Sequence, residues 1–361
     1  MSQTKKDILI NKAISLFNQG EIEKCFKEFL LAKKKYPDEP FIYNILGILS
    51  AHKSAFDESI KSYSKAIELD PNYFEAYNNI GVAYTSWKKI DKAIQNFDKA
   101  IKINPLYAEA FNNKGNALKE KGKYQLAASC YEKALSINPN YIDAMTNLGI
   151  IWDLMNNFSK AKSYFQKALS LNPNNTSVLY NLANSFFNYD NFNQSINVCQ
   201  KIIEIDKSFY FAHNRIGLCH IKLGNQKEAK LYFEKAIKIK PDYLEGLTNY
   251  GFVLQLLRDY ALATDQFEKV LSIDPNSTEA FINLSKSYYD EGRLAKAMET
   301  AKKGLSVKQS NIPLLKNLIA PLLLLNRFDE ASAACKKILS INKNDADAIN
   351  LIGTIYEKQG L

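Results

Sequence analysis

Prolines recur at intervals of 34 residues along most of this 361-residue chain. Seven of the ten prolines lie in this one phase, at Pro37, Pro71, Pro105, Pro139, Pro173, Pro241 and Pro275. A fixed period of this length indicates a repeat protein, in which one small unit is copied end to end and each copy packs on its neighbours. The sequence therefore predicts one continuous array rather than two or three separate domains.

Glycine, alanine and aromatic residues keep the same period. With the recurring proline at position 32 of a unit, glycine is frequent at positions 8 and 15, alanine at position 20, and tyrosine or phenylalanine at position 24. This pattern predicts two antiparallel helices, at about positions 1–14 and 17–30. Glycine at position 8 allows close approach of the second helix, glycine at 15 ends the first helix with positive φ, and proline at 32 stops the second.

The residues that recur at fixed positions of the repeat resemble the tetratricopeptide repeat (TPR) motif. An aromatic residue stands at position 4 in Tyr43, Tyr77 and Phe111, a leucine or isoleucine at 7, and a further aromatic at 11 in Tyr84 and Trp152. The resemblance implies an all-α fold, a TPR α-solenoid, in which antiparallel helix pairs form a right-handed superhelix with the first helices on its concave side. Pentatricopeptide repeats, which read RNA, usually have a 35-residue unit, and the unbroken spacing of 34 argues against them.

The repeat frame divides the chain into an N-terminal tail, 1–5, and ten predicted units over 6–345. The units are 6–39, 40–73, 74–107, 108–141, 142–175, 176–209, 210–243, 244–277, 278–311 and 312–345. Residues 346–361 read as the first helix of an eleventh unit. Two interpretations stay open for it: a terminal cap, or the point at which a longer protein is cut before a downstream domain.

The charge of the chain does not predict a nucleic-acid partner. Its net charge is +9, but arginine is scarce, and lysine recurs at position 26 of nine consecutive units, late in the second helix. A cation there complements the helix dipole, so a structural role is favoured over nucleic-acid binding. The five cysteines are odd in number and have no CxxC spacing, which favours free thiols in a reducing compartment. Together with the lack of a signal-like or membrane-spanning segment, this predicts a cytoplasmic protein.

No catalytic or cofactor motif is recognisable. The sequence has no GxxxxGK[ST], GxGxxG after a strand, GxSxG or HExxH. His213 and His220 stand at positions 4 and 11 of one unit, but no cysteine or carboxylate cluster completes a metal site, so they are predicted to be core or lining residues. The chain is therefore expected to be no enzyme, with no cofactor and no metal.

Asparagine dominates position 6, which the resemblance places on the concave side. Eight of eleven units carry it there, and a side-chain amide matches the alternating donors and acceptors of an extended peptide backbone. Such a row resembles the TPR arm of the O-GlcNAc transferases, whose groove asparagines hold substrate backbones. The peptide-binding residues implied, called here the asparagine row, are Asn79, Asn113, Asn147, Asn181, Arg215, Asn249, Asn283 and Asn317, with Arg215 interrupting the asparagines.

Two function hypotheses follow. The first is a protein-interaction scaffold that binds extended segments of other proteins in its concave groove. The second is the substrate-recognition arm of an O-GlcNAc transferase-like or other enzyme whose catalytic domain is not in this chain. Asparagine is also common at this position in TPR sequences that bind other ligands, so inheritance from the family pattern is the competing interpretation, and peptide contact is favoured over it. A carboxylate clamp is not predicted, because the residues before Asn116 and Asn184 in their units include no lysine pair.

Overall fold

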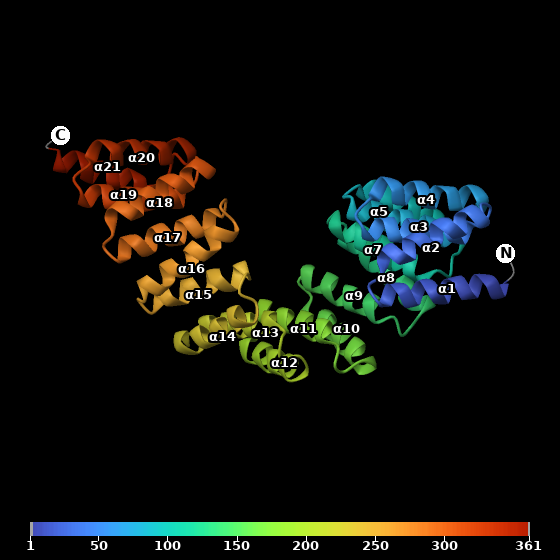
Figure 1. Cartoon of the computed structure of the whole chain (residues 1–361). Helices are drawn as coiled ribbons and strands as arrows, with labels where there is room; N and C mark the ends of the chain where they lie inside the picture. Colours follow the sequence, from blue (N-terminus) through green and yellow to red (C-terminus); the bar gives the residue numbers. More distant parts are fainter. Residues whose placement is uncertain (1–2, 360–361) are drawn as a thin grey trace. The chain divides into compact units, whose positions relative to one another are not determined.

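The computed structural model describes residues 3–359, and every regular element in that range is an α-helix (Figure 1). Residues 1, 2, 360 and 361 lie outside it, so the first part of the predicted tail and the predicted turn residue Gly360 also lie outside it. The contacts divide the chain into two compact units, Met1–Asn181 and Leu182–Leu361, and the boundary falls within one helix, α11.

The helices occur in consecutive pairs, one pair for each 34-residue repeat. In the N-terminal compact unit they are α1 (Gln3–Asn18), α2 (Ile22–Lys35), α3 (Pro40–His52), α4 (Phe56–Leu69), α5 (Phe74–Ser86), α6 (Ile90–Ile103), α7 (Ala108–Glu120), α8 (Tyr124–Ile137), α9 (Ile142–Leu154) and α10 (Phe158–Leu171). Helix α11 (Thr176–Asn188) crosses the boundary.

The same alternation continues in the C-terminal compact unit. Its helices after α11 are α12 (Phe192–Ile205), α13 (Tyr210–Lys222), α14 (Gln226–Ile239), α15 (Leu244–Leu256), α16 (Tyr260–Ile273), α17 (Thr278–Asp290), α18 (Leu294–Val307), α19 (Ile312–Leu324), α20 (Phe328–Ile341) and α21 (Ala346–Lys358). The all-α stack of antiparallel pairs predicted from the sequence is confirmed. We keep the ten-unit numbering as a proposal, because it places each helix pair from α3 to α20 in one unit.

The turn inside each pair requires positive φ, whatever residue stands there. At position 15, Gly122 has φ 70° and Gly292 has φ 82°, but Lys88 and Arg258 take φ 60° and 62° at the same place. The turn is stabilised by backbone bonds to the end of the first helix, such as the Lys89 N–H donating to the Tyr84 carbonyl at 2.8 Å. A left-handed backbone is costly for a side chain with Cβ, so the tight turn, and not the local residue, sets this conformation.

Each regular pair is held by a glycine on the first helix facing an aromatic ring on the second. An ideal Cβ placed on Gly115 would lie 2.5 Å from Cε1 of Tyr131, and one on Gly149 would lie 2.5 Å from Cε1 of Phe165. Both rings are almost completely buried. The prediction that position 8 is small because the second helix approaches closely is confirmed. This contact, together with alanines such as Ala127, fixes how the two helices pack.

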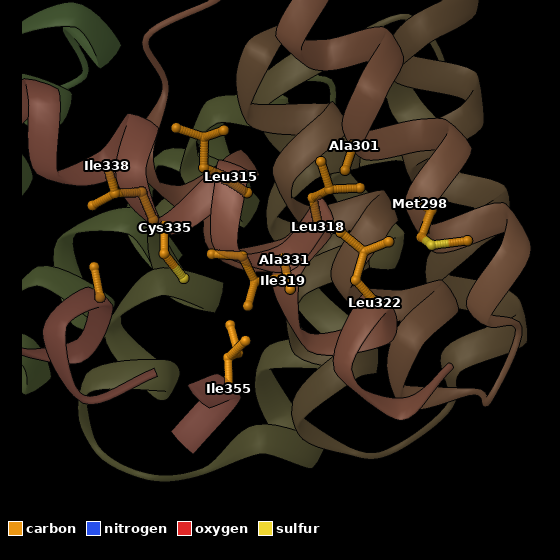
Figure 2. Close-up of a cluster of buried hydrophobic side chains, with 12 residues drawn as sticks. Met298, Ala301, Leu315, Leu318, Ile319, Leu322, Ala331, Cys335, Ile338 and Ile355 are labelled. Carbon is orange, nitrogen blue, oxygen red and sulfur yellow. The ribbon is translucent and has the colours of Figure 1, made fainter. Parts of the chain in front are cut away.

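The end of the array in the described residues is packed differently. Figure 2 shows a buried cluster from α18 to α21 that contains Leu318, Ile319, Leu322, Cys335 and Ile355. Aliphatic side chains fill this core, with no aromatic ring among its fully buried members. Within residues 3–359, no helix combines the length and the apolar character needed to cross a bilayer.

Candidate functional site

The asparagine row lies on the first helix of each pair. All eight of its residues, from Asn79 on α5 to Asn317 on α19, are half-buried. This degree of exposure means that each side chain has one part against the protein and one part reaching solvent. The row is therefore neither fully exposed nor sealed inside the helix stack.

Hydrogen bonds tie the row to the preceding repeat. Nδ2 of Asn113 donates to Oδ1 of Asn78 at 3.1 Å, and Nδ2 of Asn147 donates to Oδ1 of Asn112 at 3.0 Å. The same bond joins Asn79 to Asn44 at 3.0 Å, and Asn249 to Asn214 at 3.0 Å. In each case the acceptor is 35 residues earlier in the chain, at position 5 of the previous unit. We call this contact the inter-repeat amide bond.

The acceptors at position 5 are buried and are themselves held in place. Asn78 and Asn214 are 0% and 1% exposed, so an unbonded amide there would carry a large desolvation cost. Nδ2 of Asn214 donates to Oη of Tyr243 at 3.1 Å and to Oε1 of Glu245 at 3.0 Å. Tyr243 in turn donates to Oε2 of Glu245 at 2.9 Å. This hydrogen-bond network thus joins two successive repeats.

The same network surrounds Asn78 in the N-terminal compact unit. Its Nδ2 donates to Oε1 of Glu109 at 3.4 Å, and Oη of Tyr107 donates to Oε2 of Glu109 at 3.2 Å. Burial, and next the negative charge of Glu109, raise the pKa of Tyr107, so its hydroxyl stays protonated and remains a donor. Glu109 and Glu245, in the first turn of their helices, thus accept bonds from the preceding repeat.

Asn317 and Arg215 make other contacts. Nδ2 of Asn317 donates to the Ile282 carbonyl at 2.8 Å and to Oγ of Ser285 at 2.9 Å, so it reaches the preceding repeat through other acceptors. Arg215 replaces the amide and places its guanidinium 4.6 Å from the centre of the Phe187 ring, in cation–π geometry. Asn181 and Asn283 are half-buried on α11 and α17.

Position 5 is the part of this site that the sequence reasoning missed. Asn44, Asn78, Asn112 and Asn214 all stand in that phase, directly before position 6 of their units. Their recurrence was a usable signal. Read together with position 6, it indicates amides that pair between neighbouring repeats.

A row amide that makes one inter-repeat amide bond keeps part of its hydrogen-bonding capacity. A side-chain amide has two N–H donors and a carbonyl with two lone pairs. The inter-repeat amide bond of Asn147 uses one N–H. The second N–H and the carbonyl oxygen are the groups a peptide backbone would need, and the bond already made holds them in one orientation. Binding would then cost less side-chain entropy than binding to a mobile amide.

His213 and His220 pack within the helix pair α13 and α14. His213 is buried, and burial, followed by the charge of Lys235, lowers its pKa. The His220 ring stacks on Tyr232 with centroids 5.6 Å apart, and burial lowers its pKa as well. Within residues 3–359, no group of three or more histidine, cysteine, aspartate or glutamate side chains is arranged to hold a metal ion. Their predicted place as core or lining residues is confirmed.

All five cysteines are reduced thiols. Cys25, Cys199, Cys219 and Cys335 are buried, and Cys130 is half-buried. Burial raises the pKa of Cys199 to about 12, which keeps it protonated and poorly reactive at neutral pH. These thiols therefore behave as small apolar core residues.

Family comparison identifies the class of protein. A family model described as the tetratricopeptide repeat protein 21 C-terminal ARM domain matches residues 22–216, more than half of the chain. Two tetratricopeptide repeat models match residues 210–243 and 254–322. The chain belongs to the tetratricopeptide repeat proteins, in the family of the first of these models. The TPR resemblance inferred from the repeat pattern is confirmed. The likeness to the O-GlcNAc transferase arm stays a prediction.

Solved structures share the fold at low sequence identity. A chain of the APC/C hetero-tetramer Cut9–Hcn1 is 15% identical with a TM-score of 0.52, over 95% of this chain and 82% of that one. Pseudomonas aeruginosa PilF is 21% identical with a TM-score of 0.50, over 57% and 94%. The C-terminal part of a TPR repeat-containing protein from Cytophaga hutchinsonii is 20% identical with a TM-score of 0.50, over 66% and 98%. Among curated proteins, none matches the chain.

Proposed function

We propose that this chain is a protein-interaction scaffold that binds extended segments of partner proteins along the asparagine row. TPR domains generally mediate protein interactions, and the family assignment therefore supports the class of function. The observation that carries the proposal is the pre-set orientation of the row amides. Each of Asn79, Asn113, Asn147 and Asn249 is fixed by one bond to the preceding repeat while remaining half-exposed.

Binding through amides would depend little on the sequence of the partner. An extended peptide presents an N–H and a carbonyl at every residue, and a row of oriented amides can meet them whatever the side chains are. Selectivity would then come from the residues around the row. Arg215, which stands where other units have asparagine, is the first candidate for it, since an arginine adds charge and a planar donor group.

The test must separate peptide contact from the inter-repeat amide bond. Asn113→Ala with Asn147→Ala removes two row amides and two of these bonds. Asn78→Ala with Asn112→Ala removes the acceptors of the same two bonds but leaves the row amides in place. Binding of labelled, unstructured 15-residue peptides would be measured by fluorescence anisotropy, with circular dichroism and urea unfolding as checks on the fold.

We expect the row variant to lose at least tenfold in affinity, about 1.4 kcal/mol, and the position 5 variant to lose clearly less. Adding Asn181→Ala to the row variant should deepen the loss. Equal losses in the two variants would show that the row acts only through packing between repeats. Unchanged affinity in the row variant would remove the row from the mechanism.

The substrate-recognition arm of a transferase remains the alternative stated above. It predicts the same peptide contacts and requires a catalytic domain in addition. No feature of the described residues favours it over a scaffold.

A further inference from the structure

The second helix of the first repeat, α2, departs from the second helices of the nine later repeats. At positions 25 and 26 it carries Leu30 and Leu31, whereas every later unit has polar residues there, with lysine at 26 in all nine. Leu30 is 40% exposed and Leu31 is 62% exposed. The fold therefore does not require leucine at these positions, since nine copies of the same helix are built without it.

The opposite exchange occurs one turn later in α2. Positions 28 and 30 are leucine, isoleucine or valine in the nine later units, but they are Lys33 and Lys35 in the first. The last turn of α2 is basic at three successive residues, and Lys34 lies between the other two. The apolar and basic positions have thus changed places on one helix, so that leucine stands at positions 25 and 26, which are polar in the later units.

The exposed leucines form the wall of a hollow. Leu30, Leu31, Pro37 and Tyr43 from α3 supply its apolar lining, and Lys27, Lys33 and Lys34 supply the rest. Its volume is about 650 Å³, within the range of binding pockets. Leu31 also borders a second hollow of about 360 Å³, where it faces Ile8 and Leu9 of α1. Apolar surface is therefore continuous across the first repeat.

The lysines around the hollow differ from their neighbours in forming no ion pair within residues 3–359. Neighbouring lysines on α2 and α1 are paired, Lys24 with Glu21 at 2.7 Å and Lys12 with Glu28 at 2.9 Å. Lys27, Lys33 and Lys34 form no ion pair with any residue in the described range, and the lining contains no acidic side chain. Nζ of Lys33 lies 5.2 Å from the centre of the Tyr43 ring, which keeps this cation at the edge of the apolar surface.

Two structural explanations cover only part of this pattern. Lysines in the last turn of a helix complement the helix dipole, but the dipole does not favour exposed leucine. A terminal repeat can be irregular because one face has no neighbour, but a capping repeat needs a more polar outer face, and here polar residues have been replaced by leucine. Exposed leucines beside a basic rim are instead typical of an interaction surface.

We propose that the hollow between α2 and α3 binds a segment of a partner protein that inserts apolar side chains between Leu30, Leu31 and Tyr43 and places aspartate or glutamate beside Lys27, Lys33 and Lys34. The three cations select the charge of the partner, and the leucines supply buried apolar area. This site is separate from the asparagine row. It is proposed to recognise the side chains of a partner, whereas the asparagine row is proposed to bind the peptide backbone.

The test uses two synthetic peptide libraries and the full chain. Both libraries place two leucines three or four residues apart, one with aspartate and glutamate as flanking residues and the other with lysine and arginine. The variant Leu30→Glu with Leu31→Lys installs the residues found at the same positions in Glu132 and Lys133, so it should fold. Leu126→Lys, which changes an exposed leucine on α8, is the matched control.

We expect the wild-type chain and the Leu126→Lys control to enrich the acidic library over the basic one. The α2 variant should lose at least tenfold in affinity for the enriched peptides, and Lys33→Glu with Lys34→Glu should lose as much. Raising the salt from 50 to 300 mM should weaken binding, because the contacts include charges close to the surface.

Four results would overturn the proposal. Three of them are enrichment of neither library, equal enrichment of both, and enrichment that persists in the α2 variant. A fourth is sedimentation of the chain with phosphatidylserine vesicles that depends on Leu31, combined with no peptide binding, which would assign the surface to a membrane instead. Asn113→Ala with Asn147→Ala should leave binding of the acidic peptides unchanged, so failure of this site and failure of the asparagine row are distinguishable.

Discussion

The helix pairs α5 to α10 and the pair α19 and α20 solve one packing problem in opposite ways. In the first region the small residue is on the first helix and the large one on the second, as in Gly81 with Phe97 and Gly149 with Phe165. In α19 and α20 the large residue, Ile319, is on the first helix and the small one, Cys335, is on the second. Figure 2 shows both side chains in the same buried cluster.

The pair α17 and α18 shows an intermediate solution. Ser285 and Ala301 occupy positions 8 and 24, so neither helix contributes bulk there. The tight approach moves to Gly304 on α18, where an ideal Cβ would lie 2.7 Å from Cβ of Phe281 and 2.8 Å from Cδ1 of Leu314. The large residue at positions 8 and 24 is therefore not tied to one helix: it lies on the second helix in α9 and α10, on the first in α19 and α20, and on neither in α17 and α18.

Overfilling the glycine contact should give the largest effect. Gly115→Leu places a branched side chain where even Cβ would lie 2.5 Å from the buried Tyr131 ring. We expect a loss of about 3 kcal/mol in the free energy of unfolding, the upper part of the range for overpacked cores. Urea unfolding followed by circular dichroism measures it. Gly353→Leu is the control, because a Cβ on Gly353 meets nothing within 4 Å, and an equal loss in both variants would contradict the packing argument.

Placing the large residue on the first helix and the small one on the second, in a pair that has the reverse arrangement, should show energetic coupling between positions 8 and 24. Gly149→Ile overfills the contact with Phe165, and Phe165→Cys leaves a cavity, so each alone should cost several kcal/mol. The double variant places the α19 and α20 combination in α9 and α10. We expect it to be more stable than the sum of the single variants by about 1–3 kcal/mol in a double-mutant cycle. Additive losses would mean that volume is not shared between the two positions.

Substitution by glycine at the turn should change the free energy of unfolding least, and in the same direction in both regions. Lys88 has φ 60° and Asn326 has φ 55°, where glycine carries no steric penalty. We expect Lys88→Gly to stabilise by about 0.5–1 kcal/mol, because the relief of left-handed strain exceeds the added entropy of the unfolded chain. Asn326→Gly should stabilise less, since asparagine tolerates this conformation. Thermal unfolding of both variants checks the order, and a destabilised Lys88→Gly would contradict it.

The described site was predicted in part. The phase of Asn113 and Asn147 marked the first-helix face, because identical residues at a 34-residue spacing occupy equivalent places in successive repeats. The bonds to Asn78 and Asn112 were not predicted, since they join residues 35 apart on different helices. Only the stacking of one repeat on the next brings those amides within 3.1 Å. The role of the row in holding repeats together is therefore a property of the packing.

The sequence by itself determined the repeat, the helix pairs and the small residue at position 8, because these follow from local backbone requirements and from steric fit within one unit. The tertiary structure decided how the units are joined. It placed Asn214 against Glu245 of the next repeat, and it left Leu30 and Leu31 exposed beside three lysines. Burial and hydrogen bonding between repeats depend on which surfaces of neighbouring repeats come into contact. The order of residues along the chain does not by itself specify those contacts.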